Sequence, residues 1–160
     1  MGFELPASIG AKVGCPEETV WCVAGDGGFQ MTIQELATAV QDKVAIKIAI
    51  INNGYLGMVR QWQELFYNKR YVGTQLWNPD FVKVAAAYGI SGARVKNKKD
   101  VVPAIEKAMA HDGPYLVDFM VEPEENVYPM VPPGAALAEL MEHPEKKVTP
   151  VASSFTVSNV

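Results

Sequence analysis

Two short polar motifs contain the residues of this sequence most able to do chemistry. Gly25-Asp26-Gly27-Gly28 directly follows one apolar stretch, and Asn52-Asn53-Gly54 directly follows the next. Glycines let the backbone turn sharply and approach a ligand closely, and free N–H groups at the start of a following helix suit a phosphate. The Asp26 carboxylate and the Asn53 amide oxygen are hard ligands, which Mg²⁺ prefers beside phosphate oxygens. The two motifs together predict a magnesium–diphosphate site.

Each motif alone is weak evidence, because glycine-rich turns are common after strands and Asn-Gly is an ordinary turn signal. A dinucleotide site is the sharper alternative. Its G-x-G-x-x-G pattern fails here at Gln30, and no acidic residue ends the next strand. A P-loop is excluded because no Gly-Lys-Ser/Thr follows. The joint occurrence of the two motifs therefore favours a shared ligand site over two unrelated turns.

The residues around the motifs predict strands that alternate with helices. Three apolar, β-branched runs are typical of strands covered on both faces of a parallel sheet: residues 19–24, 44–51 and 115–121. Apolar residues at helical spacing predict helices over residues 5–13, 33–40, 81–88 and 101–110. Asn78 is a plausible N-cap for the third helix, with Pro79 in its first turn.

This alternation indicates an α/β fold, a doubly wound and mostly parallel sheet with helices on both faces. Ligands of such sheets bind beyond the carboxyl ends of the strands, where both polar motifs lie. We expect an α/β domain over residues 1–121 and an extended, proline-rich C-terminal tail over 122–160, with one short helix near 135–141 and a disordered end. The chain opens within a helix-like stretch with no strand before it, which indicates truncation.

Composition narrows the class of protein. The chain has 160 residues, 49% of them hydrophobic and 20% charged, which suits one globular domain. A net charge of −4 argues against binding to nucleic acid or an anionic membrane. No apolar run is long enough to span a membrane. Cys15 and Cys22 are expected to be free thiols in a reducing cytoplasm.

The joint pattern of Gly-Asp-Gly and Asn-Asn resembles the diphosphate-binding motif of thiamine-diphosphate enzymes. The resemblance implies that Asp26, the side chain of Asn53 and the backbone carbonyl of Tyr55 bind Mg²⁺. It further implies that thiamine diphosphate is held largely through backbone groups by a second set of residues: Gly25, Gly27, Gly28, Leu56 and Gly57.

Longer runs resemble the catalytic subunits of acetolactate synthase (acetohydroxyacid synthase), namely residues 1–7, 52–67, 70–71, 78–81 and 127–134. This resemblance implies that Met1 keeps the cofactor bent and that Met58 lies beside its thiazolium ring and the substrate. Trp62 would line the second-substrate site and the herbicide-binding channel. The plainer interpretations are that Met58 fills the core and that Trp62 anchors its helix. Glu4 stands where many relatives have glycine, near the cofactor's pyrimidine.

The implied activity is that of a transferase that condenses pyruvate with pyruvate or 2-oxobutyrate in branched-chain amino acid biosynthesis. The cofactor supplies the electron sink for loss of CO₂ from a 2-oxo acid. The family's N-terminal domain and its FAD-binding middle domain are missing from these 160 residues, so we expect this chain alone to bind Mg²⁺-diphosphate weakly and to be inactive.

The resemblance also implies a homodimer or tetramer with its active site between subunits, and it is compatible with a regulatory subunit. Two alternatives stay open. One is another thiamine-diphosphate-dependent decarboxylase, oxidase or carboligase acting on 2-oxo acids. The other is a non-catalytic, truncated binding module.

Overall fold

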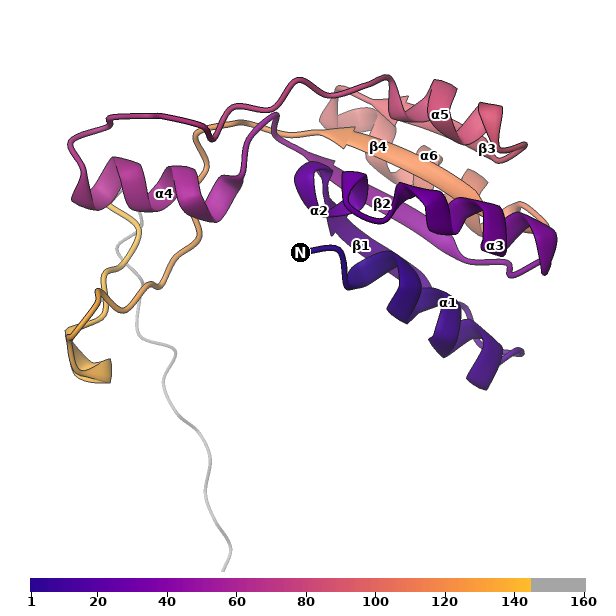
Figure 1. Cartoon of the computed structure of the whole chain (residues 1–160), viewed down its shortest axis with the longest axis horizontal. Helices are drawn as coiled ribbons and strands as arrows, with labels where there is room; N and C mark the ends of the chain where they lie inside the picture. The colour runs from indigo at the N-terminus through magenta and orange to yellow at the C-terminus, as the bar shows by residue number, and fades with distance from the viewer. Residues whose placement is uncertain (145–160) are drawn as a thin grey trace, which may run out of the picture. The chain divides into compact units, whose positions relative to one another are not determined.

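One parallel sheet organises the first unit of the chain, Met1–Glu125. The computed structural model describes residues 1–144. Within them, four strands pair in the order β1-β2-β4-β3, and every pairing is parallel (Figure 1). The strands are β1 (Trp21–Gly25), β2 (Lys47–Asn52), β3 (Ser91–Val95) and β4 (Tyr115–Met120).

Helices connect consecutive strands, as a parallel sheet requires. The connecting helices are α2 (Asp26–Gln30), the 3-10 helix η1 (Ile33–Glu35), α3 (Leu36–Gln41), α4 (Gly57–Phe66), α5 (Phe81–Ala87), the 3-10 helix η2 (Lys98–Asp100) and α6 (Val101–Ala110). One further helix, α1 (Glu4–Gly14), precedes β1. The predicted α/β architecture with helices on both faces of a parallel sheet is confirmed.

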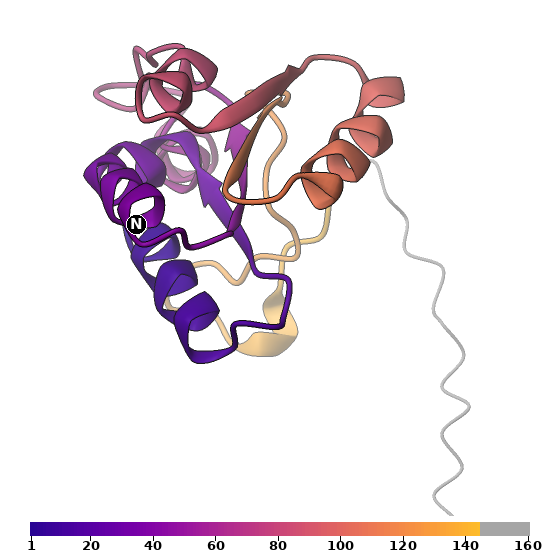
Figure 2. The same ribbon diagram turned by 90° about the vertical axis from the view of Figure 1, so that its right-hand side faces the viewer.

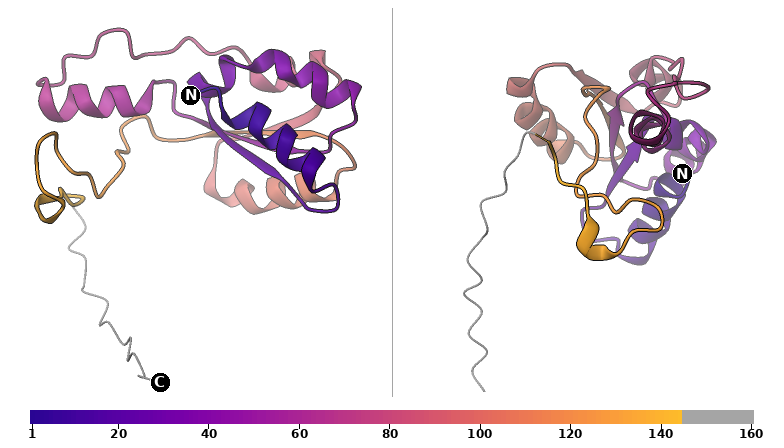
Figure 3. Two further views of the ribbon diagram at one scale, coloured as in Figure 1. Left: turned by 60° about the horizontal axis from the view of Figure 1, so that its bottom comes forward. Right: turned by 90° about the vertical axis from the view of Figure 1, so that its left-hand side faces the viewer.

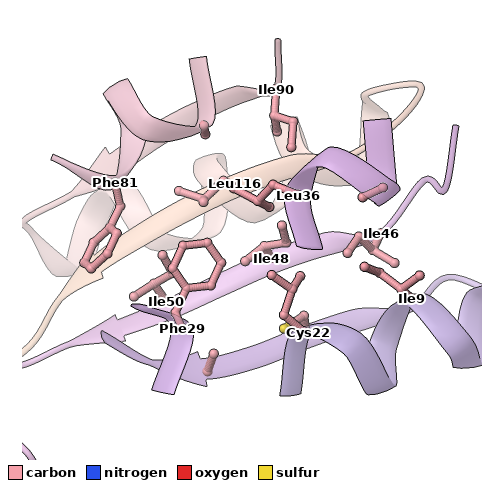
Figure 4. Close-up of a cluster of buried hydrophobic side chains, with 14 of the residues drawn as sticks. Ile9, Cys22, Phe29, Leu36, Ile46, Ile48, Ile50, Phe81, Ile90 and Leu116 are labelled. Atoms are coloured by element: carbon pink, nitrogen blue, oxygen red, sulfur yellow. The ribbon is translucent and has the colours of Figure 1, made fainter. Parts of the chain in front are cut away.

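Apolar side chains cover the sheet in two separate layers because successive residues of a strand point to opposite faces. Leu116 of β4 belongs to the larger core, which packs α1, α2, α3 and α5 on one face (Figure 4). Its neighbours Tyr115 and Val117 belong to the smaller core under α6. Figure 2 shows α6, in salmon, on the opposite side of the sheet from the indigo and purple helices.

The strand β3 was not predicted, because its sequence SGARV lacks the apolar character of a buried strand. It forms an edge of the sheet, and of its residues only Val95 is buried.

The prediction that residues 19–24 are covered on both faces was wrong for β1. Cys22 and Ala24 are buried, whereas Val23 is 61% exposed because α6 packs on β3 and β4 instead.

The N-cap of α5 also differs from the prediction. Asp80, not Asn78, precedes the helix, and its side chain accepts a hydrogen bond from the backbone N–H of Lys83. That bond is the main reason the pKa of Asp80 lies below its usual value. Asp and Asn are equally good caps, so the sequence left the choice open, and Asn78 is engaged elsewhere.

The second unit, from Asn126 on, has little regular structure among its described residues. The 3-10 helix η3 (Leu137–Glu139) is shorter than the helix predicted over 135–141. Met130 and Met141 form an antiparallel bridge. The predicted disorder at the end of the tail lies outside the residues that the structure describes.

Gly92→Ala is expected to destabilise the first unit by about 1–3 kcal/mol, the usual effect of overpacking. A Cβ atom at position 92 would lie 2.8 Å from the backbone carbonyl oxygen of Leu116, the residue with which Gly92 is paired in the sheet. Urea unfolding followed by circular dichroism measures the change. Gly10→Ala is the matched control, since a Cβ there meets nothing within 4 Å and alanine favours a helix. Equal stability of the two variants would contradict the prediction.

Candidate metal centre

The two polar motifs meet at the carboxyl edge of the sheet because β1 and β2 are parallel neighbours. Gly25 pairs with Ile51, so the residues that follow each strand begin at the same level. The Asp26 side chain reaches from the end of β1 to the loop after β2, where its Oδ2 accepts a hydrogen bond of 2.8 Å from the backbone N–H of Gly54. The structure thus brings together the two motifs that the sequence paired.

Asp26 is almost completely buried, with 2% of its surface exposed. Its Oδ2 accepts a second hydrogen bond, of 2.6 Å, from the side-chain amide of Asn78. Among the described residues no donor contacts the other carboxylate oxygen, Oδ1. A buried carboxylate is costly unless it is satisfied, so a cation at Oδ1 would complete its surroundings.

Asn53 and Tyr55 lie in a tightly held loop. Asn53 Oδ1 accepts a hydrogen bond of 3.0 Å from the backbone N–H of Tyr55. Leu56 N–H donates to the carbonyl of Thr74, and Leu76 N–H donates to the carbonyl of Gly54, each at 2.8 Å. In residues 1–144 no backbone N–H donates to the Tyr55 carbonyl oxygen, which leaves it available as a ligand.

A cavity of about 280 Å³ joins the residues named from the sequence as cofactor ligands. Its lining includes all of them: Met1, Gly25, Asp26, Gly27, Gly28, Asn53, Tyr55, Leu56, Gly57 and Met58. The cavity thus combines one buried carboxylate, amide and carbonyl oxygens, and glycine backbone. Within residues 1–144 no three His, Cys, Asp or Glu side chains come together at a possible metal site, so a metal here requires this mixed set of oxygens.

The wall of this cavity is closely packed around Gly27. A Cβ atom at Gly27 would lie 2.8 Å from Leu56 Cδ2, 3.0 Å from Leu76 Cδ1 and 3.4 Å from the methyl group of Met1.

Glu4 also lines the cavity, and its Oε2 is buried without a hydrogen-bond partner in the described residues. A second carboxylate therefore faces the same cavity as Asp26, which makes the cavity more favourable for cations.

Helix α4 continues from the loop after β2 and carries the other two predicted site residues (Figure 3). Met58 and Trp62 both line a second cavity of about 590 Å³. Met58 also lines the first cavity, so it lies at the boundary of the two. Met58 is 52% and Trp62 39% exposed, so neither fills a core or acts as a buried anchor within this chain.

The buried side of α4 is polar, the reverse of an ordinary surface helix. Arg60, 3% exposed, forms ion pairs with Glu64 and Glu124 at 3.0 and 3.2 Å. Its guanidinium also lies 4.8 Å from the ring centre of Tyr71, at cation–π distance. The contacts of the buried Arg60 thus hold the polar side of α4 inward and leave its apolar side, with Met58 and Trp62, toward the open cavity.

Asn78 is the site residue that sequence reasoning missed. Its amide contacts Asp26, and it also donates to Asn52 Oδ1 at 2.9 Å. The available signal was the pair of capping candidates in Asn78-Pro79-Asp80. Since Asp80 alone suffices as a cap, Asn78 was free for another role.

Asn52, which accepts from Asn78, also contacts a buried ion pair between Asp118 and Arg94. Asp118 is fully buried and accepts hydrogen bonds from Asn52 Nδ2 at 2.9 Å and from Arg94 Nε at 2.8 Å. Arg94 also contacts Asp80 at 2.9 Å. The hydrogen bond to Asp118 is the main cause that raises the pKa of Arg94. A continuous polar network therefore connects Asp26 to the start of α5.

No helix among the described residues is long and apolar enough to span a lipid bilayer.

Comparison with known protein families gives a match over residues 1–119. The matching family is described as "Thiamine pyrophosphate enzyme, C-terminal TPP binding domain". The matched segment includes every residue that lines the two cavities around Asp26 and Trp62.

Curated relatives include the acetolactate synthase isozyme 2 large subunit of Escherichia coli K12, 47% identical over 143 residues, and an acetolactate synthase of Mycobacterium avium, 50% identical over 146 residues. The alignments cover 89% and 88% of this chain but only 26% and 24% of the relatives. The chain therefore spans about a quarter of the length of these proteins.

A solved structure with a similar fold is the thiamine diphosphate-dependent 4-hydroxybenzoylformate decarboxylase of Rhodococcus jostii RHA1. It superposes with a TM-score of 0.72 at 33% identity, over 76% of this chain and 23% of the decarboxylase.

Proposed function

Since the chain belongs to the family of thiamine pyrophosphate enzymes, as their C-terminal cofactor-binding domain, we propose that it holds thiamine diphosphate through Mg²⁺ in the cavity beside Asp26. The observation that carries this proposal is the cavity itself. It gathers the buried Asp26 carboxylate, the Asn53 amide and the glycine backbone of the first motif around one space.

In the proposed site, Mg²⁺ takes Asp26 Oδ1, the Asn53 side-chain oxygen and the Tyr55 carbonyl oxygen as its protein ligands. All three are oxygens, as this cation prefers, and the diphosphate would complete the set. The absence of side chains at Gly27 and Gly28 allows the backbone to approach the diphosphate. When bound, the cofactor supplies the electron sink for reactions of 2-oxo acids.

For the complete protein, the proposed activity is acetolactate synthesis from pyruvate, alone or with 2-oxobutyrate, in the cytoplasm. Support comes from the acetolactate synthases among the relatives and from Met58 and Trp62, which face a shared apolar cavity on α4. The proposal includes N-terminal and FAD-binding domains outside these 160 residues, an active site between the subunits of a dimer or tetramer, and room for a regulatory subunit.

A second candidate is a related decarboxylase, oxidase or carboligase with the same cofactor domain. The specific observation in its favour is the fold shared with a 4-hydroxybenzoylformate decarboxylase at 33% identity. The cofactor site is common to both candidates, so product analysis of the complete protein with pyruvate, 2-oxobutyrate and aromatic 2-oxo acids distinguishes them. Acetolactate as the main product supports the first candidate.

Calorimetric titration of thiamine diphosphate into the purified chain tests the cofactor site. We expect weak binding with Mg²⁺ and none with EDTA, because Asp26 and Glu4 would repel the diphosphate without a cation. We also expect no acetolactate from this chain alone. Binding that is independent of Mg²⁺ would contradict the proposed metal site, and robust acetolactate formation by the 160 residues would contradict their dependence on further domains.

A further inference from the structure

The side-chain amide of Asn78 lies between the ends of two strands and uses each of its polar atoms. Its two N–H groups donate to Asp26 Oδ2 at 2.6 Å and to Asn52 Oδ1 at 2.9 Å. Its Oδ1 accepts a hydrogen bond of 2.7 Å from Gln30 Nε2. Turning the amide by half a rotation would place its oxygen against the Asp26 carboxylate and its nitrogen against the amide nitrogen of Gln30. The orientation of Asn78 is therefore determined by its partners.

This orientation determines how Asp26 presents its carboxylate. Oδ2 is held by two donors, the Asn78 amide and the Gly54 backbone N–H. Oδ1 is left without a donor among the described residues, and Asp26 lines the cavity. Because the two oxygens share one plane, fixing Oδ2 also fixes the direction of Oδ1.

The segment that carries Asn78 is itself anchored on both sides. Asp80, two residues later, caps α5 and contacts Arg94, whose Nε binds the buried Asp118. Asp118 in turn accepts from Asn52, the second acceptor of the Asn78 amide. The hydrogen bonds thus close a ring through β2, β3 and β4, which leaves Asn78 little freedom to move relative to Asp26.

The chemistry of an amide suits this position. A lysine here would form an ion pair with Asp26 and compete with a metal, whereas an apolar residue would leave Oδ2 with one donor only. The neutral amide donates a hydrogen bond and leaves the carboxylate with its charge. Partners of this kind behind metal ligands typically account for 10–100-fold in metal affinity.

We propose that Asn78 is a positioning residue that orients the Asp26 carboxylate toward the metal ion. The inference rests on the proposed function, since it assigns Asn78 to the Mg²⁺ site around Asp26. Asn78 does not itself line the cavity beside Asp26, so it acts on the metal through Asp26.

The test measures binding of Mn²⁺, a paramagnetic substitute for Mg²⁺, to the chain in the presence of thiamine diphosphate. Electron paramagnetic resonance gives both the free Mn²⁺ concentration and the spectrum of the bound ion. We expect Asn78→Ala to weaken Mn²⁺ binding by about 10–100-fold and to change the spectrum of the bound ion. Asn97→Ala is the matched control. It removes an amide–carboxylate hydrogen bond of 3.0 Å, to Asp100 at an exposed position, and should leave both readouts unchanged.

A merely structural role for Asn78 would lower the thermal stability but leave the spectrum of the bound ion as it is. If the Mn²⁺ affinity of Asn78→Ala stays within about twofold of that of the unaltered chain, or if its spectrum is unchanged, the inference is overturned while the proposed function stands. Absence of Mn²⁺ binding by the unaltered chain would overturn the proposed function and this inference with it. If Asn78→Ala does not fold, Asn78→Leu replaces it, because leucine is of similar size and cannot donate a hydrogen bond to Asp26. Unchanged Mn²⁺ affinity in Asn78→Leu would then overturn the inference.

Discussion

Asp26→Asn is expected to abolish Mg²⁺-dependent binding of thiamine diphosphate, with a loss of more than about a hundredfold in affinity, while the chain stays folded. An asparagine can keep an oxygen toward the two donors that hold Oδ2, Gly54 N–H and the Asn78 amide. Its NH₂ group would then take the place of Oδ1, and a nitrogen that carries two hydrogens cannot bind a cation. Since residues behind a metal ligand already account for 10–100-fold, loss of the charged ligand itself should exceed that.

The measurement is calorimetric titration at fixed Mg²⁺, with circular dichroism as the check on folding. Asp42→Asn provides the matched control, because it makes the same change of charge at an exposed residue after α3. Asp26→Ala is less informative, since it also removes the acceptor of two hydrogen bonds. Binding by Asp26→Asn that equals that of Asp42→Asn would rule out Asp26 as a metal ligand.

The second large effect concerns stability. Phe29→Ala is expected to lower the free energy of unfolding by about 3–5 kcal/mol, the usual range for a fully buried phenylalanine. Phe29 has no exposed surface, and its ring meets that of Phe81 edge to face, with 5.6 Å between the ring centres. Figure 4 shows the two rings in the core between α2 and α5.

This substitution should also weaken cofactor binding. Helix α2 has five residues, and two of them are glycines, so its own helical propensity is low. Its position at the end of β1, with Asp26 as its first residue, therefore depends on the packing of Phe29. Urea unfolding measures the stability, and Phe3→Ala, at a residue 77% exposed, is the control. A loss below about 1 kcal/mol in Phe29→Ala would contradict the assigned role, and Phe29→Leu should recover part of the loss.

The sequence predicted the sheet and the meeting of the two motifs because both depend on local patterns. Apolar runs identify strands that are buried on both faces, as for β2, whose residues Ile48, Ala49 and Ile50 are all buried. Parallel pairing then places Asp26 and Asn53 at one edge of the sheet. The prediction needed no knowledge of side-chain positions.

Other features depend on tertiary contacts that no local pattern reveals. Within the described residues, the edge strand β3 pairs with another strand on one side only, and of its residues only Val95 is buried, so its sequence lacks the signal of a buried strand. Asn78 contacts Asp26 of the proposed metal site, whereas Asp80 caps α5 and contacts Arg94. These roles follow from tertiary contacts and not from the local sequence. The polar buried side of α4 likewise follows from the partners that Arg60 finds in Glu124 and Tyr71.

The hydrogen bonds that build the proposed metal site join residues far apart in the chain. Asp26 bonds to residues 28 and 52 positions later, and Asn52 bonds to a residue 66 positions later. Such contacts form only after long loops have closed, which makes parallel sheets slow to fold. During synthesis the site is therefore incomplete until Asp118 has emerged. Because a ligand that binds only the native state stabilises it, occupancy of this site by Mg²⁺ and thiamine diphosphate should protect the chain from proteolysis, so the cofactor's availability would influence how much of the protein survives.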